Sequence, residues 1–190
     1  MNIPRHRNAT DTRRRLLEAA GDIARDAGAA SLSLDAVAAR AGVSKGGLLY
    51  HFPSRHALLA ALVADKMTTM RRFVEDHAPG ALSGEGNAID GARAYLDLME
   101  QNFTCCERPA SGVLAAMLED PEFMQPVCDF RDAVAAMFAR CNDPETARVV
   151  YLACEGLNLL RLTGGDPCPD GPQPQIFVTL RRLLDRACGT

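Results

Sequence analysis

The stretch 32–59, LSLDAVAARAGVSKGGLLYHFPSRHALL, decides the fold of the N-terminal part of the chain. Ser33 can cap a helix that ends at Gly42, and Ser44 can cap a second, very short helix that Pro53 terminates. Only three residues separate these helices, and this spacing predicts a helix-turn-helix. Pairs of helices with this spacing also occur in proteins that never contact DNA.

Helical periodicity continues through most of the chain, with apolar residues three and four positions apart. The segments 78–86 and 164–172 are rich in Gly and Pro; the first is expected to be a flexible connection and the second a loop. No alternating strand pattern is present, so the sequence predicts an all-α protein of about nine helices. The expected helices are 11–27, 34–41, 45–51, 55–76, 88–103, 111–118, 122–141, 144–162 and 173–187.

The composition of the 190 residues suits a folded protein, because 47% are hydrophobic and 24% are charged. The first fifteen residues are polar and basic, without the apolar segment of a signal peptide. No stretch is long and apolar enough to span a membrane. We therefore expect a cytoplasmic protein with no membrane partner.

The net charge of −3 is unevenly distributed. Residues 1–55 contain nine Lys and Arg against five Asp and Glu, whereas residues 56–190 contain twelve against nineteen. The basic N-terminal part suggests that only one end of the molecule meets a polyanion, although a solvated surface has the same composition.

The second short helix contains two adjacent glycines, Gly46 and Gly47, each costing about 1 kcal/mol relative to alanine in a helix. A helix whose backbone must closely approach another surface tolerates them, because they remove side-chain bulk. Hydroxyl groups, positive charges and a further helix N-terminus at Ser54 are nearby, and all suit phosphate oxygens. The pattern favours a recognition helix whose first turn enters the major groove of DNA.

Residues 41–59 resemble the DNA-binding signature of the tetracycline-repressor (TetR) family. The shared pattern is a helix ending in Ala-Gly-Val-Ser, then a short helix ending in Tyr-x-Phe-x-x-Arg/Lys-x-x-Leu. The match runs from about Thr12 to Ala64, and the remaining two-thirds agrees only in general layout. The resemblance implies a non-enzymatic repressor that binds double-stranded operator DNA and has no cofactor. It also implies that the protein binds a small-molecule effector and dimerises through its last two helices.

The resemblance also implies roles for individual residues. Ser44 would cap the recognition helix and contact phosphate, and Lys45 would lie against the bases or the adjacent backbone. Leu49 stands where an aromatic residue is common, and Arg55 stands in for a usual lysine. With two glycines in the first turn, base contacts would be few and DNA shape would supply some specificity. The predicted DNA-binding residues are Ser33, Ser44, Lys45, Gly46, Gly47, Leu49, Tyr50, His51 and Arg55, whereas Val43, Leu48 and Phe52 are interpreted as core.

The N-terminal arginines leave two interpretations open. They form either a solvated tail or an arm that contacts the minor groove of A·T-rich DNA. These arginines are Arg5, Arg7, Arg13, Arg14 and Arg15.

An effector cavity is expected among the fifth to eighth helices, lined by apolar and aromatic residues. Asn158 is singled out, because a buried amide must find a hydrogen-bond partner, either a ligand or the second subunit. Few charges lie on these faces, so the sequence favours an apolar or aromatic effector. The predicted effector-binding residues are Tyr95, Met99, Phe103, Met117, Phe123, Phe130, Met137, Cys154 and Asn158.

The expected domain organisation is a DNA-binding domain over 1–54 and an effector-binding and dimerisation domain over 55–190. The helix 55–77 would connect them, and its tilt on effector binding would change the spacing of the two recognition helices. Helix 144–162 is apolar on most sides, as expected of a helix at a dimer interface.

Functions of other classes have less support. An alternative is a redox-responsive regulator that uses its C-terminal cysteines, but low thiol pKa values are not indicated. His6, His51, His56 and His77 precede every cysteine without metal-ligand spacing, so no metal site is predicted. No phosphate loop or nucleophile motif of an enzyme is present. The cysteines are Cys105, Cys106, Cys128, Cys141, Cys154, Cys168 and Cys188.

Overall fold

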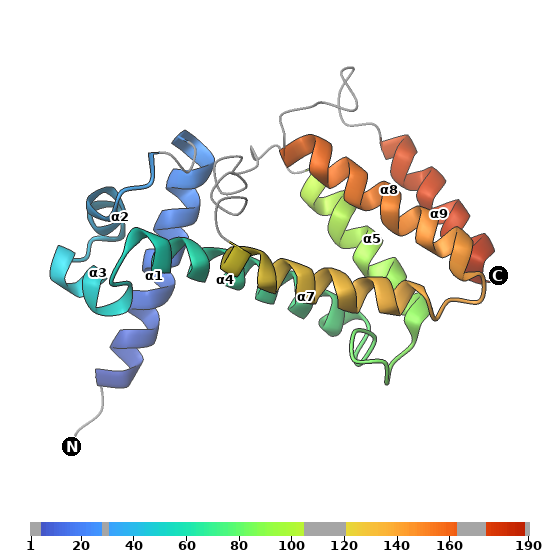
Figure 1. The fold of residues 1–190 in the computed structure, drawn as a ribbon, viewed down its shortest axis with the longest axis horizontal. Helices are drawn as coiled ribbons and strands as arrows, with labels where there is room; N and C mark the ends of the chain where they lie inside the picture. The colour runs from blue at the N-terminus through green and yellow to red at the C-terminus, as the bar shows by residue number, and fades with distance from the viewer. Residues whose placement is uncertain (1–4, 28–30, 105–120, 163–173, 189–190) are drawn as a thin grey trace. The chain divides into compact units, whose positions relative to one another are not determined.

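The computed structural model describes residues 5–27, 31–104, 121–162 and 174–188. Within these ranges the chain forms eight helices and no strand, which confirms the all-α prediction (Figure 1). The ninth predicted helix, 111–118, lies outside the described residues. None of the described helices has the length and apolar character needed to cross a bilayer.

The chain divides into two compact units. Unit 1 comprises residues 1–66 and 108–125, and unit 2 comprises residues 67–107 and 126–190.

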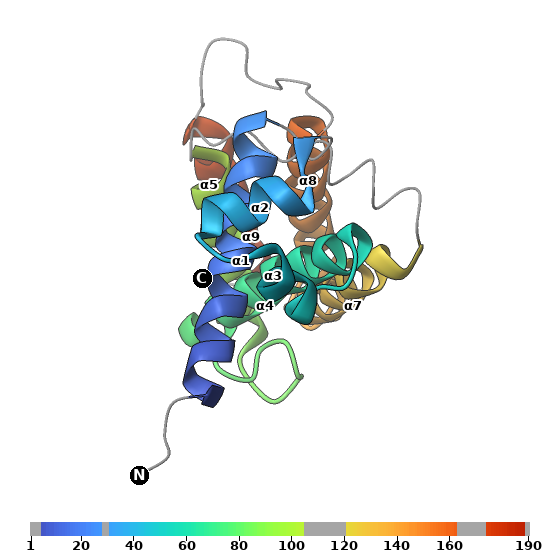
Figure 2. The ribbon, with the colours of Figure 1, turned by 90° about the vertical axis from the view of Figure 1, so that its left-hand side faces the viewer.

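Unit 1 has a core of mostly aliphatic side chains. Figure 2 shows α2 packed along α1, with α3 next to α2. Leu16, Val37, Leu48 and Leu58 are completely buried, so each of the first four helices contributes one anchor to this core. These helices are α1 (Arg5–Ala27), α2 (Leu34–Ala41), α3 (Lys45–His51) and, up to residue 66, α4 (Arg55–His77).

Unit 2 has an aromatic core. In Figure 1, α8 and α9 run side by side, and α5 packs against both. The Tyr95 ring lies edge-on to Phe138 at 5.8 Å, and Phe138 lies 5.6 Å from the Tyr151 ring. Besides the end of α4, the helices are α5 (Ala88–Thr104), α7 (Pro121–Phe138) from residue 126 onwards, α8 (Pro144–Leu162) and α9 (Pro174–Cys188).

Local signals account for several helix ends in this unit. A proline is the first residue of each of the helices α7, α8 and α9. At this position the N–H group that proline lacks would have no partner within the helix, so its absence costs nothing. Asp143 caps α8, because its carboxylate accepts hydrogen bonds from the Thr146 backbone N–H (3.2 Å) and hydroxyl (2.6 Å). These bonds lower the pKa of Asp143.

Two sequence expectations are wrong. α1 begins at Arg5, six residues before the expected start, because no glycine or proline between 5 and 11 interrupts it. The segment 78–86 is a packed turn rather than a flexible connection, since Ala81 is completely buried and Leu82 nearly so. The Glu75 carboxylate accepts hydrogen bonds from the backbone N–H groups of Gly80 (2.7 Å) and Leu82 (3.2 Å), which closes the turn.

Candidate DNA-binding and effector sites

The helix-turn-helix is held by local hydrogen bonds. The Ser33 hydroxyl accepts from the Ala36 N–H at 3.1 Å, and the Ser44 hydroxyl accepts from the Gly47 N–H at 3.1 Å. Gly42 ends α2 in the left-handed conformation, with φ of 63°, which glycine adopts without strain. The predicted caps and turn are therefore present, and both serines use their hydroxyls to begin a helix.

The predicted recognition helix, α3, is anchored from one side only. Leu48 is completely buried and Phe52 nearly so, as expected for core residues, and Val43 packs against the same cluster. Leu49 is 39% exposed and Tyr50 is 82% exposed. The Tyr50 ring lies edge-on to His51 at 5.2 Å. A large exposed aromatic side chain beside an imidazole leaves this face of α3 suited to contact a partner.

The two glycines of α3 have different explanations. A Cβ atom on Gly47 would lie 2.9 Å from Val43 Cγ1 and 3.2 Å from the Ser44 hydroxyl, so the turn itself favours glycine there. A Cβ atom on Gly46 would meet nothing within 4 Å. The packing of the fold therefore does not require glycine at position 46, whereas it favours glycine at position 47.

We expect Gly46→Ala to raise the free energy of unfolding by up to about 1 kcal/mol, because alanine is the better helix former. The same substitution should weaken binding to a selected operator duplex about tenfold, since the new methyl group would separate α3 from DNA. Thermal unfolding and binding at one fixed salt concentration measure the two effects. Gly47→Ala is the comparison, and it should destabilise the protein instead. Unchanged operator affinity in Gly46→Ala would show that no surface approaches position 46.

Positive side chains at the ends of α3 already have partners within unit 1. The Lys45 ammonium pairs with Asp35 of α2 at 2.9 Å, and both side chains are largely exposed. Such an exposed pair is worth little, so a phosphate can replace the carboxylate at low cost. Arg55 donates from Nε to the Leu32 carbonyl oxygen at 2.8 Å, which fixes the start of α4 beside α2.

All five N-terminal arginines lie within α1, and the interactions of three of them are with other residues of unit 1. The Arg13 guanidinium lies 5.1 Å from the centre of the Phe52 ring, and Arg15 donates to the Ala41 carbonyl oxygen. Arg14 pairs with Asp11 and Glu18. These interactions give the three arginines structural roles in the helix-turn-helix.

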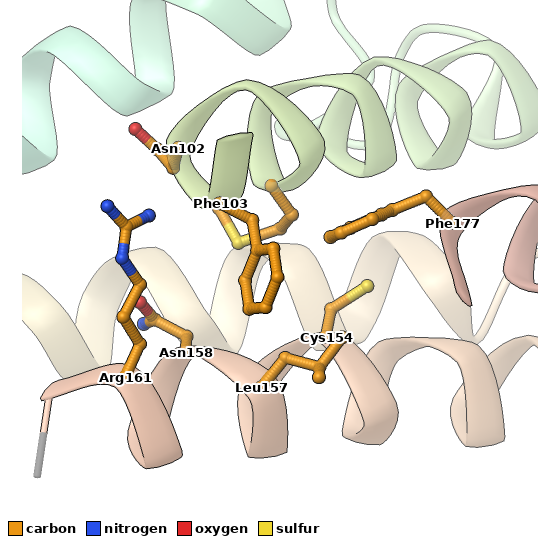
Figure 3. A pocket seen from close by; sticks show the side chains of 8 residues that line it. Asn102, Phe103, Cys154, Leu157, Asn158, Arg161 and Phe177 are labelled. Carbon is orange, nitrogen blue, oxygen red and sulfur yellow. The ribbon is translucent and has the colours of Figure 1, made fainter. Parts of the chain in front are cut away.

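Unit 2 contains a small pocket between α5, α8 and α9 (Figure 3). Its volume is about 10 Å³, enough for about one water molecule. An effector would therefore have to displace side chains to enter. The lining residues are Met99, Asn102, Phe103, Cys154, Leu157, Asn158, Arg161 and Phe177.

The predicted effector-binding residues have different locations. Met99, Phe103, Cys154 and Asn158 line the pocket. The others do not: Tyr95, Phe130 and Met137 lie in the core of unit 2, Phe123 packs 4.5 Å from the His56 ring in unit 1, and Met117 lies outside the described residues.

Sequence reasoning missed four lining residues: Asn102, Leu157, Arg161 and Phe177. Leu157 and Arg161 continue the three- and four-residue spacing of Cys154 and Asn158 along one face of α8, so periodicity was a usable signal for them. No local signal connects Phe177 of α9 to this face.

A partly buried polar network links two of the pocket helices, α5 and α8, to α7. The Tyr95 hydroxyl donates to Glu155 Oε1 at 2.6 Å, and Arg131 Nε pairs with Glu155 Oε2 at 2.6 Å. Burial, together with the neighbouring Glu155 carboxylate, raises the pKa of Tyr95 well above its usual value. The network joins α5, α7 and α8, so the Tyr95 hydroxyl is already committed to a structural partner.

The cysteines that the structure describes give the redox alternative no support. Cys141 and Cys154 are buried and Cys128 is exposed. Burial, followed by the charge of Glu155, raises the pKa of Cys154 to about 12. A thiol with this pKa is almost entirely protonated at neutral pH and is a poor nucleophile.

We therefore expect iodoacetamide at pH 8 to label Cys128 in the native protein while Cys154 stays unmodified. Peptide mass spectrometry measures both sites in one sample. Unfolding in urea should remove the difference, because burial is its cause. Equal labelling of Cys128 and Cys154 in the native protein would contradict this assignment.

Exposed large hydrophobic side chains gather in two places within the described part of the chain. Leu49 and Tyr50 are on α3, and the remaining five form what we call the α8–α9 apolar face. That face consists of Val149, Leu152, Leu159 and Leu160 of α8 with Val178 of α9. Gly156 lies on the same helix, and a Cβ atom there would meet nothing within 4 Å. Such a surface suits another protein.

Two family models match the chain. Residues 16–62 match the model of bacterial regulatory proteins of the tetR family, and residues 90–185 match the tetracyclin repressor-like C-terminal domain. The first match contains the helix-turn-helix and the second contains the pocket.

Individual proteins with similar sequences or structures are consistent with these models. The A-factor receptor protein of Streptomyces griseus is 23% identical over 162 residues, 80% of this chain and 55% of that protein. The chain thus spans about half the length of this relative.

Two solved structures are similar over nearly the full length of both chains. The multidrug binding protein EbrR complexed with malachite green has 25% identity and a TM-score of 0.65, covering 94% of this chain and 98% of that one. A TetR family member from Streptomyces coelicolor has 26% identity and a TM-score of 0.66, covering 94% and 99%. The family consists of non-enzymatic DNA-binding regulators. The chain therefore belongs to the tetracycline-repressor (TetR) family of transcriptional regulators.

Proposed function

We propose that this regulator is a homodimeric repressor, which leaves a palindromic operator when a small molecule with an apolar or aromatic body binds in the pocket of unit 2. The observation that carries the DNA-binding part is the one-sided anchoring of α3, with Leu48 buried and Tyr50 exposed. In this proposal Ser44, Lys45 and Gly46 face the DNA, and Tyr50 and His51 contact phosphates at the edge of the groove.

The proposed domains are a DNA-binding domain over 1–54 and an effector-binding and dimerisation domain over 55–190. The helix 55–77 connects them, and α4 contributes residues to both compact units. A displacement of α4 would affect both units. This supports α4 as the element that couples effector binding to DNA binding. An effector acts only through its different affinities for the two states.

The α8–α9 apolar face is the proposed dimer interface. Five exposed hydrophobic side chains support this role, and Gly156 leaves room for close approach of a second helix. A two-fold dimer presents two copies of α3 to two half-sites about 34–36 Å apart, as a palindromic operator requires.

Regulation by a small molecule is supported by the relatives. EbrR is a multidrug binding protein with solved malachite green and ethidium complexes. The relative from Streptomyces griseus is named as the A-factor receptor protein. The pocket of unit 2 lies inside the region matched by the C-terminal family model. We propose it as the effector site, with Met99, Phe103, Cys154 and Asn158 among its contacts.

The deciding experiment is selection of bound sequences from random duplex DNA with the purified full-length chain at a stated salt concentration. Recovery of a palindrome with two half-sites is the expected result and provides the operator for every other test. Weak binding that is indifferent to sequence and disappears with added salt would contradict operator recognition.

A further inference from the structure

The ring of Phe103 lies in the middle of the unit 2 pocket. Figure 3 shows Asn158 and Arg161 on one side of it, at what we call the polar end. Cys154 and Phe177 lie on the other side, at the apolar end. The centre of the Phe103 ring is 5.5 Å from that of Phe177. Phe103 therefore separates the two ends of the pocket.

The two ends of the pocket differ in their access to solvent. Cys154 and Phe177 are each 1% exposed, so the apolar end is closed. Asn158 and Arg161 at the polar end are partly exposed, and so is Phe103 itself. A molecule that enters from the solvent at the polar end therefore meets the Phe103 ring before it reaches the apolar end.

Phe103 is the least buried of the apolar side chains that line the pocket. Met99, Cys154, Leu157 and Phe177 are all buried, whereas Phe103 is only partly buried. It is also the next-to-last residue of α5, and the last turn of a helix has carbonyl groups without partners inside the helix. Moving the Phe103 ring towards the solvent exposes less new apolar surface than moving the Phe177 ring, so it costs less free energy.

The space that the Phe103 ring fills indicates which molecule can take its place. The apolar lining of the pocket comes from Met99, Leu157 and Phe177, so a planar ring of the same size regains the same kind of contacts. A charged body would lose its hydration beside these side chains without gaining a partner. The free volume beside the ring is about 10 Å³, which adds room for about one small substituent.

The polar end can bind such a substituent. Asn102 and Asn158 line the pocket there, and each side-chain amide offers two N–H donors and a carbonyl acceptor. Neither amide group hydrogen-bonds to a side chain or backbone group within the part of the chain that the structure describes. A hydroxyl group on the ligand can therefore donate to one amide or accept from it.

We infer that the effector is an uncharged molecule with one aromatic ring and one neutral polar substituent, and that its ring displaces the ring of Phe103. Asn102 and Asn158 bind the substituent. This inference rests on the proposed function, because it assigns the ligand class of the same pocket. Phe103 remains a contact of the effector, as the side chain that the effector displaces.

The first test follows the Phe103 ring in the full-length protein. Incorporation of 4-fluorophenylalanine labels the seven phenylalanines with fluorine, and the signal lost in Phe103→Leu identifies that of Phe103. Phenol is expected to move this signal towards its position in the unfolded protein, because the displaced ring becomes solvated. Cyclohexanol has the same hydroxyl on a non-planar ring, and it should bind about tenfold more weakly because it lacks the aromatic contact with Phe177.

The second test removes the ring. Phe103→Ala should bind phenol at least about tenfold more tightly than the wild type, because no side chain has to be displaced first. The substitution leaves a cavity and lowers the unfolding temperature, and phenol should restore much of this loss.

The matched control is Phe138→Ala, which removes the same atoms from the core of unit 2. Phe138 is 1% exposed and is not among the residues that line the described pocket. The hydroxyl of the neighbouring Tyr95 is bound to Glu155, so a phenol hydroxyl buried in this cavity would lack a ready partner. Phenol should therefore not restore the unfolding temperature of Phe138→Ala.

Three results would overturn the inference: a Phe103 signal that about 10 mM phenol does not move, equal phenol affinity in the wild type and Phe103→Ala, or equal restoration of Phe103→Ala and Phe138→Ala. The fluorine measurement on the wild-type sequence decides the question even where an alanine variant does not fold.

Operator binding is measured separately on the duplex recovered by selection. If phenol displaces Phe103 but leaves operator affinity unchanged, the assignment of the pocket stands and the proposed release mechanism fails. If the operator is bound and another compound releases it while phenol leaves Phe103 in place, the proposed function stands and this inference fails.

Discussion

Leu152→Glu is expected to convert the proposed dimer into a monomer and to lower operator affinity at least about 100-fold. Leu152 is 58% exposed and belongs to the α8–α9 apolar face. Two copies of a glutamate, one from each subunit, would be buried near each other in a two-fold interface without partners, and each buried unpaired charge costs several kcal/mol. A monomer presents one recognition helix to the operator instead of two. It therefore loses the gain in affinity of about 10²–10⁴-fold that two linked binding elements provide.

Sedimentation equilibrium measures the oligomeric state of this variant, and titration of the selected operator measures its affinity. The matched control is Ala136→Glu, which adds the same charge at an exposed position of α7 in the same unit. The control should remain dimeric and bind the operator normally. A Leu152→Glu protein that is still dimeric would assign the dimer interface to a different surface.

Leu48→Ala is expected to lower the free energy of unfolding by about 2–5 kcal/mol, the range for removing a fully buried leucine. The effect is large for this helix, because α3 has seven residues and Leu48 is its one buried residue. A helix this short is not stable in isolation and depends on packing. Operator binding should fall as well, since α3 loses the contact that orients it.

The neighbouring Leu49→Ala is the control for this loss of packing. Leu49 is 39% exposed, so its truncation should change stability by no more than about 0.5 kcal/mol. Urea unfolding of both variants measures the difference, and operator titration shows whether Leu49 contributes to DNA binding. Equal stability losses in the two variants would contradict the one-sided anchoring of α3.

The architecture of the helix-turn-helix follows from the sequence, because its determinants act within one helical turn. Ser33 and Ser44 accept hydrogen bonds from N–H groups three residues ahead, and Gly42 supplies the left-handed residue that ends α2. The apolar spacing also identifies Leu48 and Phe52 as core. Local chemistry of this kind is contained in a short stretch of chain.

The pocket of unit 2 could be predicted only in part. Periodicity places Cys154 and Asn158 on one face of α8, and Met99 and Phe103 on one face of α5. It does not distinguish a residue that fills the core from one that lines a cavity, so Tyr95 was assigned to the site although its hydroxyl is bonded to Glu155. Arg161 was missed as a lining residue, because periodicity alone does not say how far along α8 the pocket extends.

The sequence by itself determined the helical class and the helix-turn-helix with its caps, because these depend on neighbours a few residues apart. Only the tertiary structure decided that 78–86 is a packed turn and that Gly46 differs from Gly47 in what surrounds it. It alone brought Phe177 to the same pocket as Phe103 and Arg161. Each of these depends on the close packing of side chains or turns whose proximity local periodicity does not specify.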